Sequence, residues 1–194
     1  MSHAIYQTPA LILKTKNMRE ANKLVILYTR EFGLLFVSSQ SIRVLSSKMR
    51  FHTSSLSLVD VDLVEGRDIW KLTGIHENIS ALRLAGTSWY DLSLNISRVI
   101  MRLCKGEESN LALWEDIQSL YTYMTDHSEP SAYDRKILEI IIVVRILYHL
   151  GYWQGDDEIT QTENFFDTMI HTYVETHRKK LIAGIHDAFE ESQL

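Results

Sequence analysis

At 194 residues, the chain is long enough for one large domain or two small ones, each with a core of its own. Its hydrophobic fraction of 45% and charged fraction of 23% are ordinary globular values, which exclude a disordered or fibrous chain. The net charge of −5 is unevenly distributed: residues 1–80 hold 10 Lys/Arg and 7 Asp/Glu, whereas residues 81–194 hold 10 and 18. A basic first half joined to an acidic second half indicates a local site for a polyanion.

The cysteine content and the apolar runs indicate in which cellular compartment the protein is expected. Cys104 is the single cysteine, so it can form neither an internal disulfide nor a thiolate cluster for structural zinc. The N-terminus lacks the pattern of a signal peptide, and the longest apolar run, residues 140–144, is too short to span a bilayer. We therefore expect a protein of the reducing cytoplasm with no membrane partner.

Five short strands are predicted in approximately the first 75 residues. Alternating or continuous apolar patterns place them at 4–15, with an irregularity at Pro9, and at 23–29, 34–38, 58–63 and 68–75. The segment 39–57 is rich in Ser, Thr and basic residues without apolar periodicity, and is predicted to be mostly loop. Five short antiparallel strands are typical of a small barrel or sandwich, and the OB-fold is the five-stranded barrel that binds oligonucleotides.

Helical periodicity replaces the strand pattern from Asn78, which is a plausible N-cap. One helix is predicted from residue 79 to Gly106, a second over 111–124, and a buried third over 133–150, ended by Gly151. A polar link at 154–161 then leads to one or two final helices. The predicted fold class is α+β: a five-stranded OB-fold barrel at 1–77, which binds DNA, followed by an α-helical, partner-binding domain at 78–194.

Basic residues of the first domain are the candidate nucleic-acid site, because lysine and arginine neutralise phosphates. The candidates are Lys14, Lys16, Arg19, Lys23, Arg30, Arg43, Lys48 and Arg50. Rings on which bases could stack are offered by Tyr6, Tyr28, Phe36 or Phe51. The alternative is ordinary solvated surface charge, which the pattern alone does not exclude.

Catalytic and metal sites are disfavoured. His171, His177 and His186 are the closest set of histidines, but their spacings do not place them on one helical face, so no metal site is expected. Cys104 lies beside apolar positions and is expected to be a small buried hydrophobe. The chain contains no phosphate-binding loop, nucleophile elbow or zinc-protease motif, so we expect no enzyme and no cofactor.

Residues 20–33, Glu-Ala-Asn-Lys-Leu-Val-Ile-Leu-Tyr-Thr-Arg-Glu-Phe-Gly, resemble the N-terminal domain of the bacterial RecO recombination mediators. The resemblance continues through the first strand at 12–15, the basic loop at 41–51 and the two strands within 58–73. It returns at 145–152, Arg-Ile-Leu-Tyr-His-Leu-Gly-Tyr, which is similar to the end of the buried helix of the family.

The resemblance implies a non-enzymatic mediator of DNA repair and recombination, associated with the nucleoid. Such proteins bind single- and double-stranded DNA, anneal complementary strands, and with RecR help RecA to replace single-strand binding protein. The position of Arg145 implies contact with the acidic C-terminal tail of single-strand binding protein. The competing hypotheses are a protein-interaction adaptor whose OB-fold has lost DNA binding, and an unrecognised hydrolase.

Three departures from the family pattern affect these expectations. Residues 153–161 contain no cysteine where many members carry a four-cysteine zinc module, so no zinc is expected. The loop has Ser41 and a single Arg43 in place of glycine and more basic residues, which predicts weaker and more salt-sensitive binding to DNA. Ile142 and Val143 replace the aromatic-acidic pair that is common before the Arg145 position, and the chain is short for the family.

Overall fold

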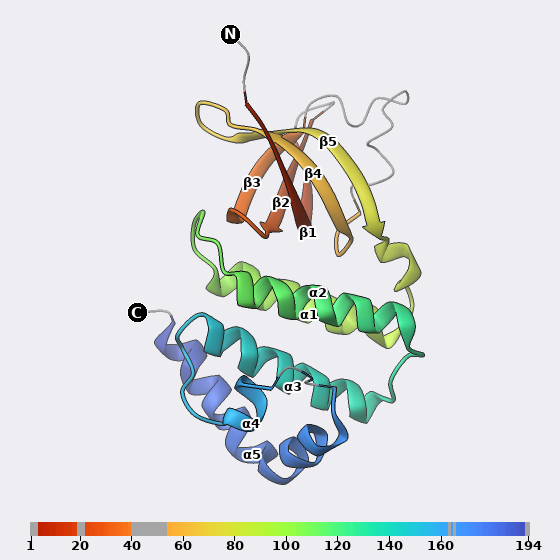
Figure 1. The fold of residues 1–194 in the computed structure, drawn as a ribbon, viewed down its shortest axis with the longest axis vertical. Coiled ribbons are helices and arrows are strands. Elements are labelled where there is room, and N and C mark those ends of the chain that lie inside the picture. Colours follow the sequence, from red (N-terminus) through yellow and green to blue (C-terminus); the bar gives the residue numbers. More distant parts are fainter. Residues whose placement is uncertain (1–3, 19–21, 40–53, 163, 165, 193–194) are drawn as a thin grey trace.

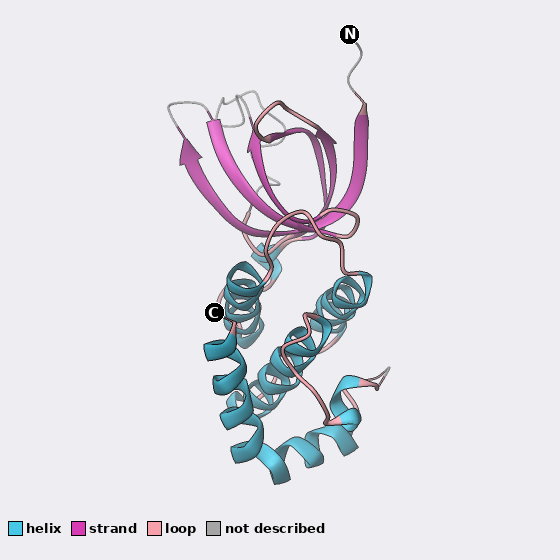
Figure 2. Ribbon diagram, turned by 90° about the vertical axis from the view of Figure 1, so that its left-hand side faces the viewer, coloured by secondary structure: helices cyan, strands magenta, loops and turns pink. Residues whose placement is uncertain are grey.

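Five strands close into a barrel at one end of the molecule, and the helices lie at the other end (Figures 1 and 2). The computed structural model describes residues 4–18, 22–39, 54–162, 164 and 166–192. The strands are β1 (Ile5–Met18), β2 (Asn22–Thr29), β3 (Gly33–Ser39), β4 (Leu58–Val64) and β5 (Trp70–Ile79). Their order around the barrel is β1-β2-β3-β5-β4, with β3 and β5 parallel and the other pairs antiparallel. The predicted fold class, an OB-fold barrel followed by helices, is confirmed.

β1 is buried on both of its faces in the middle of its length. Ala10 and Ile12 point into the barrel, whereas Leu11 and Leu13 belong to the core shared with the helices. The pairing of β1 with β2 shifts register between Ile12 and Lys14. The irregularity predicted at Pro9 is wrong in its position, because Pro9 pairs in regular register with Asp60 of β4. Beyond the register shift, the side chains of Lys14 and Lys16 are exposed.

The helical part contains a 3₁₀ turn, η2 (Ala81–Arg83), and five α-helices. These are α1 (Ser88–Leu103), α2 (Leu111–Asp126), α3 (Ala132–His149), α4 (Asp157–Thr160) and α5 (Thr168–Glu191). α3 is the central helix, with ten buried residues, as its apolar sequence predicts. It ends in a Schellman motif, because Gly151 has a φ of 81° and the amide of Tyr152 donates to the Leu147 carbonyl at 2.8 Å.

The prediction that a helix starts after Asn78 is wrong. β5 continues to Ile79, which pairs with Leu58 of β4, and α1 begins only at Ser88. Gly86, with a φ of 80°, lies between the 3₁₀ turn and α1 and prevents one continuous helix. The sequence pattern also missed α4, which lies inside the predicted polar link, and the final segment is the single helix α5.

Besides the core inside the barrel, a second hydrophobic core is shared by the barrel and the helices. Outward-facing barrel residues such as Leu13 and Tyr28 pack in the same cluster as Trp89 and Leu92 of α1. The Ser97 hydroxyl donates to the Leu13 carbonyl at 3.0 Å, which ties α1 directly to β1. The two parts are therefore joined by packing as well as by the chain. None of the helices in the described ranges is both long and apolar enough to cross a membrane.

Candidate nucleic-acid interface

Lysines of β1 occupy the outer surface of the barrel. Lys14 and Lys16 are exposed and stand two residues apart, so their side chains emerge from the same face of the strand. Lys14 pairs with Ile26 of β2, and Lys16 pairs with Leu24. Because directly paired residues of antiparallel strands project to the same side, Ile26 and Leu24 extend this surface across β2.

The two lines of directly paired residues, Lys14–Ile26 and Lys16–Leu24, continue onto β3 and β5. Ile26 pairs with Phe36, which is 50% exposed, and Leu24 pairs with Ser38. Ser38 in turn pairs with Lys71 of β5, whose side chain is exposed. Lys14, Lys16, Phe36 and Lys71 thus lie on one curved surface, which we call the lysine face.

Lys71 is a candidate site residue that the sequence analysis missed. The signal that could have found it is its position between Trp70 and Leu72, which both face the barrel interior and so turn Lys71 outward. The loop that precedes Lys71, residues 65–69 between β4 and β5, carries the exposed Arg67. OB-folds bind oligonucleotides with the face of strands 2 and 3 and the loops 1–2 and 4–5. Arg67 lies in loop 4–5, and Phe36 lies on strand 3, whereas Lys71 extends the face onto strand 5.

Lys23 lies at the end of the barrel that is remote from the helices. It is half-buried and pairs with Asn17 of β1 and Ser39 of β3, so it follows the inward-facing parity of Val25 and Leu27. The end of β1, the start of β2 and the end of β3 therefore meet around Lys23. The lysine face reaches this same end through Lys16, the neighbour of Asn17.

Arg30 does not join this group, contrary to the sequence-based grouping. β2 runs toward the helices, so Arg30 follows its last residue at the opposite end from Lys23 (Figure 1). Seven residues of strand separate the two, which corresponds to roughly 23 Å. The Arg30 guanidinium also lies 3.4 Å from the carboxylate of Glu31, which reduces its charge at that end. Lys23 and Arg30, which the sequence analysis assigned to one site, therefore lie at opposite ends of the barrel.

Of the aromatic candidates, too, some lie on the lysine face and others lie away from it. Tyr28 is 1% exposed and packs between the barrel and the helices, so the expectation that it stacks on a base is wrong. Tyr6 is exposed, but its ring packs edge-on against Phe32 and Trp70 at 5.7 Å and 5.5 Å. Phe36 is the one of these rings that stands on the lysine face. Candidate residues Arg19, Arg43, Lys48, Arg50 and Phe51 lie outside the described residues.

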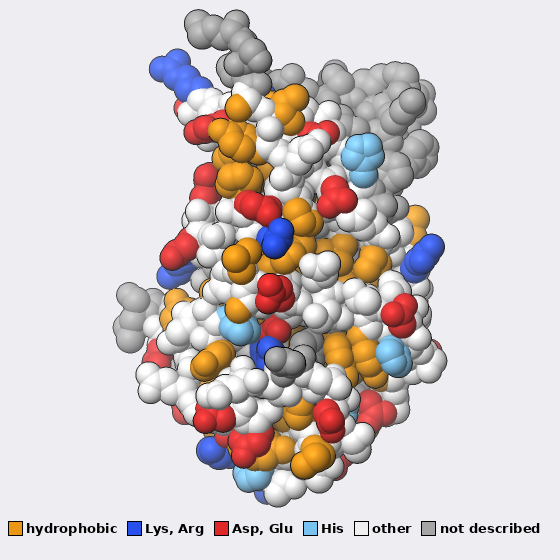
Figure 3. All heavy atoms as spheres, viewed as in Figure 1, with side chains coloured by type: hydrophobic (Ala, Val, Ile, Leu, Met, Phe, Trp, Pro, Cys, Tyr) orange, Lys and Arg blue, Asp and Glu red, His pale blue; other side chains and the backbone are white. Residues whose placement is uncertain are grey.

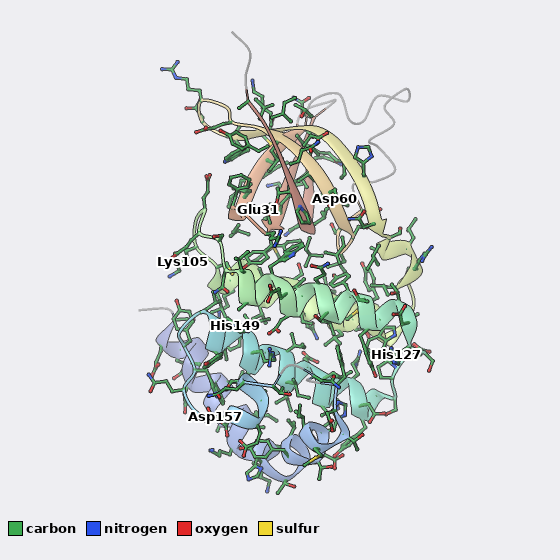
Figure 4. The ribbon with its side chains drawn as sticks, viewed as in Figure 1. Glu31, Asp60, Lys105, His127, His149 and Asp157 are labelled. Atoms are coloured by element: carbon green, nitrogen blue, oxygen red, sulfur yellow. The ribbon has the colours of Figure 1, made fainter. Side chains whose placement is uncertain are left out.

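Acidic side chains occupy another side of the barrel. Asp60 and Asp62 project outward from β4, and Asp62 accepts a hydrogen bond from Gln7 at 2.8 Å. Asp60 lies on the barrel face turned to the viewer in Figure 4, and acidic side chains are scattered over both barrel and helices in the same view in Figure 3. A polyanion would be repelled there, so the lysine face is the favourable side of the barrel for a phosphate backbone.

Comparison with known proteins identifies the barrel. Residues 1–77 match the family model described as "Recombination protein O N terminal". The barrel is therefore similar to the N-terminal domain of RecO proteins. The chain is 26% identical over 132 residues to the DNA repair protein RecO of Dehalococcoides mccartyi, which covers 64% of this chain and 50% of that protein.

Two further RecO relatives cover different parts of the chain. The DNA repair protein RecO of Clostridium novyi is 22% identical over 151 residues, 77% of this chain and 57% of the relative. That of Cutibacterium acnes is 34% identical over 64 residues, 33% of this chain and 26% of the relative. The chain therefore spans about a quarter to just over half of the length of these RecO proteins.

Arg145, the partner-binding candidate from the sequence, is turned inward. It is 7% exposed, and its guanidinium forms two hydrogen bonds with Asp116 of α2, at 2.6 Å and 2.7 Å. It also donates to the carbonyls of Ile159 and Thr162, at 2.7 Å and 2.9 Å. In this arrangement Arg145 joins α2 and α3 to the segment around α4, which disfavours its direct contact with a partner protein.

Asp116 is the anion at the centre of this buried network, and the sequence analysis did not single it out. Its Oδ2 also hydrogen-bonds to Nε2 of His149 at 2.9 Å. Burial by itself raises the pKa of Asp116, but the hydrogen bonds from His149 and Arg145 and the charge of Arg145 outweigh it and hold this pKa below its ordinary value. The carboxylate is therefore charged at neutral pH.

The remaining candidates from the sequence are separated along the helices. His171, His177 and His186 all lie on α5, and Nδ1 of His177 is 3.0 Å from the Tyr173 carbonyl oxygen. Across the residues given above, no three His, Cys, Asp or Glu side chains come together in a way that could hold a metal ion. Cys104 is half-buried at the end of α1 rather than on the helix itself, and burial raises its pKa to about 11.

Proposed function

We propose that this chain is a non-enzymatic mediator of DNA recombination and repair, which binds DNA through the lysine face of its OB-fold. In this proposal it binds single- and double-stranded DNA, anneals complementary strands, and assists the loading of RecA onto DNA coated with single-strand binding protein. The match of residues 1–77 to the RecO N-terminal model and the names of the RecO relatives support the general role.

The observation that carries the DNA-binding part is the cross-strand row from Lys16 through Leu24 and Ser38 to Lys71. It places two cations on a surface built from four strands, with Lys14 and the exposed ring of Phe36 in the adjacent row. Lysines on this surface would neutralise phosphates of a bound strand, and a ring between them would stack on a base. Arg19, Arg43, Lys48 and Arg50 are retained as predicted additional phosphate contacts.

A salt titration of fluorescent single-stranded DNA tests the proposal. Each phosphate contact contributes about 0.7 to the slope of log affinity against log salt concentration. Substituting alanine at Lys14, Lys16 and Lys71 together is therefore expected to flatten that slope by up to about 2. A combined Arg43, Lys48 and Arg50 variant tests the predicted loop in the same assay.

Arg30→Ala is the matched control, because it also removes one cation from the barrel but at the end next to the helices. It should leave the slope almost unchanged. An unchanged slope in the triple lysine variant would move the DNA site elsewhere, and no binding at low salt in the unmodified chain would remove the mediator role.

A second candidate function is a protein-interaction adaptor whose OB-fold has lost DNA binding. The charge balance of residues 81–194, with 18 Asp/Glu against 10 Lys/Arg, favours it because an acidic helical part repels a polyanion. The titration above separates the two candidates, since an adaptor has no salt-dependent affinity for DNA.

RecR and the C-terminal tail of single-strand binding protein are proposed partners on the basis of the family. Because Arg145 is bonded internally, we propose that it positions α2, α3 and α4 rather than contacting the tail. A calorimetric titration with an acidic peptide that ends in phenylalanine tests this. Direct contact predicts that Arg145→Lys abolishes binding in a chain that remains folded, whereas a positioning role predicts that it weakens binding and stability together.

A further inference from the structure

Two stretches of the helical part contain no lysine or arginine. Residues 106–134, which include α2, hold 7 Asp/Glu, and residues 146–177, which include α4 and the start of α5, hold 6. The fold brings the two stretches together, because the ring of Phe166 stacks on the ring of Tyr123 at a centroid distance of 3.7 Å and an interplanar angle of 6°. A surface with a single sign of charge therefore forms where α2 meets the segment before α5.

A groove of about 440 Å³ follows this contact along α2. Its lining on α2 comes from positions 115, 118, 119, 122, 123 and 126, and the other lining residues are His127 and Phe166. Positions three and four residues apart share one face of a helix, so the groove runs along a single face of α2. Figure 4 shows His127 at the end of α2 that leads into α3, and hydrophobic side chains lie beside a histidine at the same place in Figure 3.

Stacked aromatic rings form the apolar wall of the groove. Tyr123 lies between Phe166 and His127, whose ring centroid is 3.8 Å from that of Tyr123 with an interplanar angle of 15°. Nδ1 of His127 donates to the Tyr123 carbonyl at 3.0 Å, and the ring of Trp89 packs edge-on against Tyr123 at 6.0 Å. These contacts hold the rings in place before any partner arrives, which reduces the entropic cost of binding.

Carboxylates mark the two ends of this helix face. Glu115 and Asp126 line the groove and are exposed, and within the described parts of the chain neither has a lysine or arginine partner. They are eleven residues apart on α2, which corresponds to about 16 Å, so one metal ion cannot bridge them. The free carbonyls at the C-terminal end of α2 add partial negative charge near Asp126.

The lining indicates an extended, cationic occupant. An extended peptide covers about 16 Å with roughly five residues, so two long basic side chains of a short segment can reach both carboxylates. Arginine fits better than lysine, because its planar guanidinium is less strongly hydrated, stacks on aromatic rings and pairs with carboxylates. The phosphates of DNA would be repelled by the same carboxylates.

We propose that the groove between α2 and Phe166 is the docking site for an extended, arginine-bearing segment of a partner protein. The carboxylates of Glu115 and Asp126 attract its cations, and the rings of Phe166 and His127 contact its guanidinium groups. This site lies on the helical part, whereas the lysine face lies on the barrel. The proposal therefore holds whether or not DNA binds at the lysine face.

Binding of a fluorescently labelled hexa-arginine peptide to the full chain, measured by anisotropy, tests the role of the carboxylates. Glu115→Gln combined with Asp126→Asn should raise the Kd about 5- to 20-fold, the effect of losing two exposed charge contacts. Glu65→Gln combined with Asp68→Asn is the matched control, because it removes the same charge from exposed positions between β4 and β5. It should change the Kd less than about 2-fold, since salt screens distant charges. Equal increases in the two variants, or no binding by the unmodified chain, overturn the proposal.

Phe166→Leu tests the rings, because it removes the aromatic face and keeps an apolar side chain. The unmodified chain should bind hexa-arginine more tightly than hexa-lysine, and this preference should fall about 2- to 5-fold in the variant, the effect of losing one cation–π contact. Phe189→Leu is the control, since Phe189 is also partly buried in the helical part but does not line the groove. Equal affinities of the unmodified chain for the two peptides, or an undiminished preference in Phe166→Leu, would overturn the assignment to arginine.

Discussion

Gly33 and Glu108 are in such close approach that a β-carbon on Gly33 would lie 2.1 Å from the Glu108 carbonyl oxygen. Gly33 also has a φ of 63°, a conformation that other residues adopt at a cost. Gly33→Ala should therefore lower the free energy of unfolding by roughly 2–5 kcal/mol, through backbone strain and the displaced loop. Urea unfolding measures this loss.

Gly155→Ala separates the two contributions to this loss. Gly155 has a φ of 82°, but no atom lies within 4 Å of the position that its β-carbon would take. Gly155→Ala should lower the free energy of unfolding only by the cost of backbone strain, roughly 1–3 kcal/mol. Equal losses in the two variants would show that the contact between barrel and α1–α2 loop does not constrain Gly33.

Removal of the Asp116 carboxylate should be among the most destabilising changes in the helical part. Asp116→Ala leaves the Arg145 guanidinium buried without its anion, which costs roughly 3–5 kcal/mol. Asp91→Ala breaks the exposed pair with Arg135 and should cost at most about 1 kcal/mol. Chemical denaturation of both variants tests the contrast, and similar small losses would indicate that water reaches the network.

Acid should weaken the fold through the same carboxylate. The pKa of Asp116 is lowered in the folded chain, so its contribution to stability is complete above the unfolded value of about 3.9 and is lost as the pH falls through the lower folded value. Asp116→Asn should consequently show a smaller loss of stability below about pH 4 than the unmodified chain. Denaturation midpoints of both proteins, measured across this pH range, test the prediction. Parallel pH profiles of the two proteins would contradict the assignment of the acid sensitivity to Asp116.

Lys71 should contribute to DNA affinity as much as the lysines of β1 do. Lys71→Ala is expected to reduce the slope of log affinity against log salt by about 0.7, the effect of one phosphate contact. Fluorescence anisotropy with single-stranded DNA measures it against Arg30→Ala. If Arg30→Ala has the larger effect, DNA follows the end of the barrel next to the helices instead of the lysine face.

The sequence predicted the elements whose pattern is local. The alternating Val59, Val61 and Leu63 of β4 give the strand, and the apolar run of α3 with Gly151 at its end gives the buried helix and its stop. Where pairing between distant segments competes with a local pattern, the prediction failed. Asn78 has the chemistry of a helix cap, but its neighbours Glu77 and Ile79 pair with Val59 and Leu58 of β4, about 20 residues away in the sequence, and so keep it in β5.

Residue type and period determined the five-stranded barrel, the helical part and the set of candidate cations, because burial on one face of a strand or helix imposes a repeat on the sequence. Only the tertiary structure decided which cations share a surface. Register brings Lys71 beside Ser38 and carries Arg30 to the far end, and packing of α2 on α3 turns Arg145 toward Asp116. These relationships depend on contacts between residues far apart in the chain, which no local pattern records.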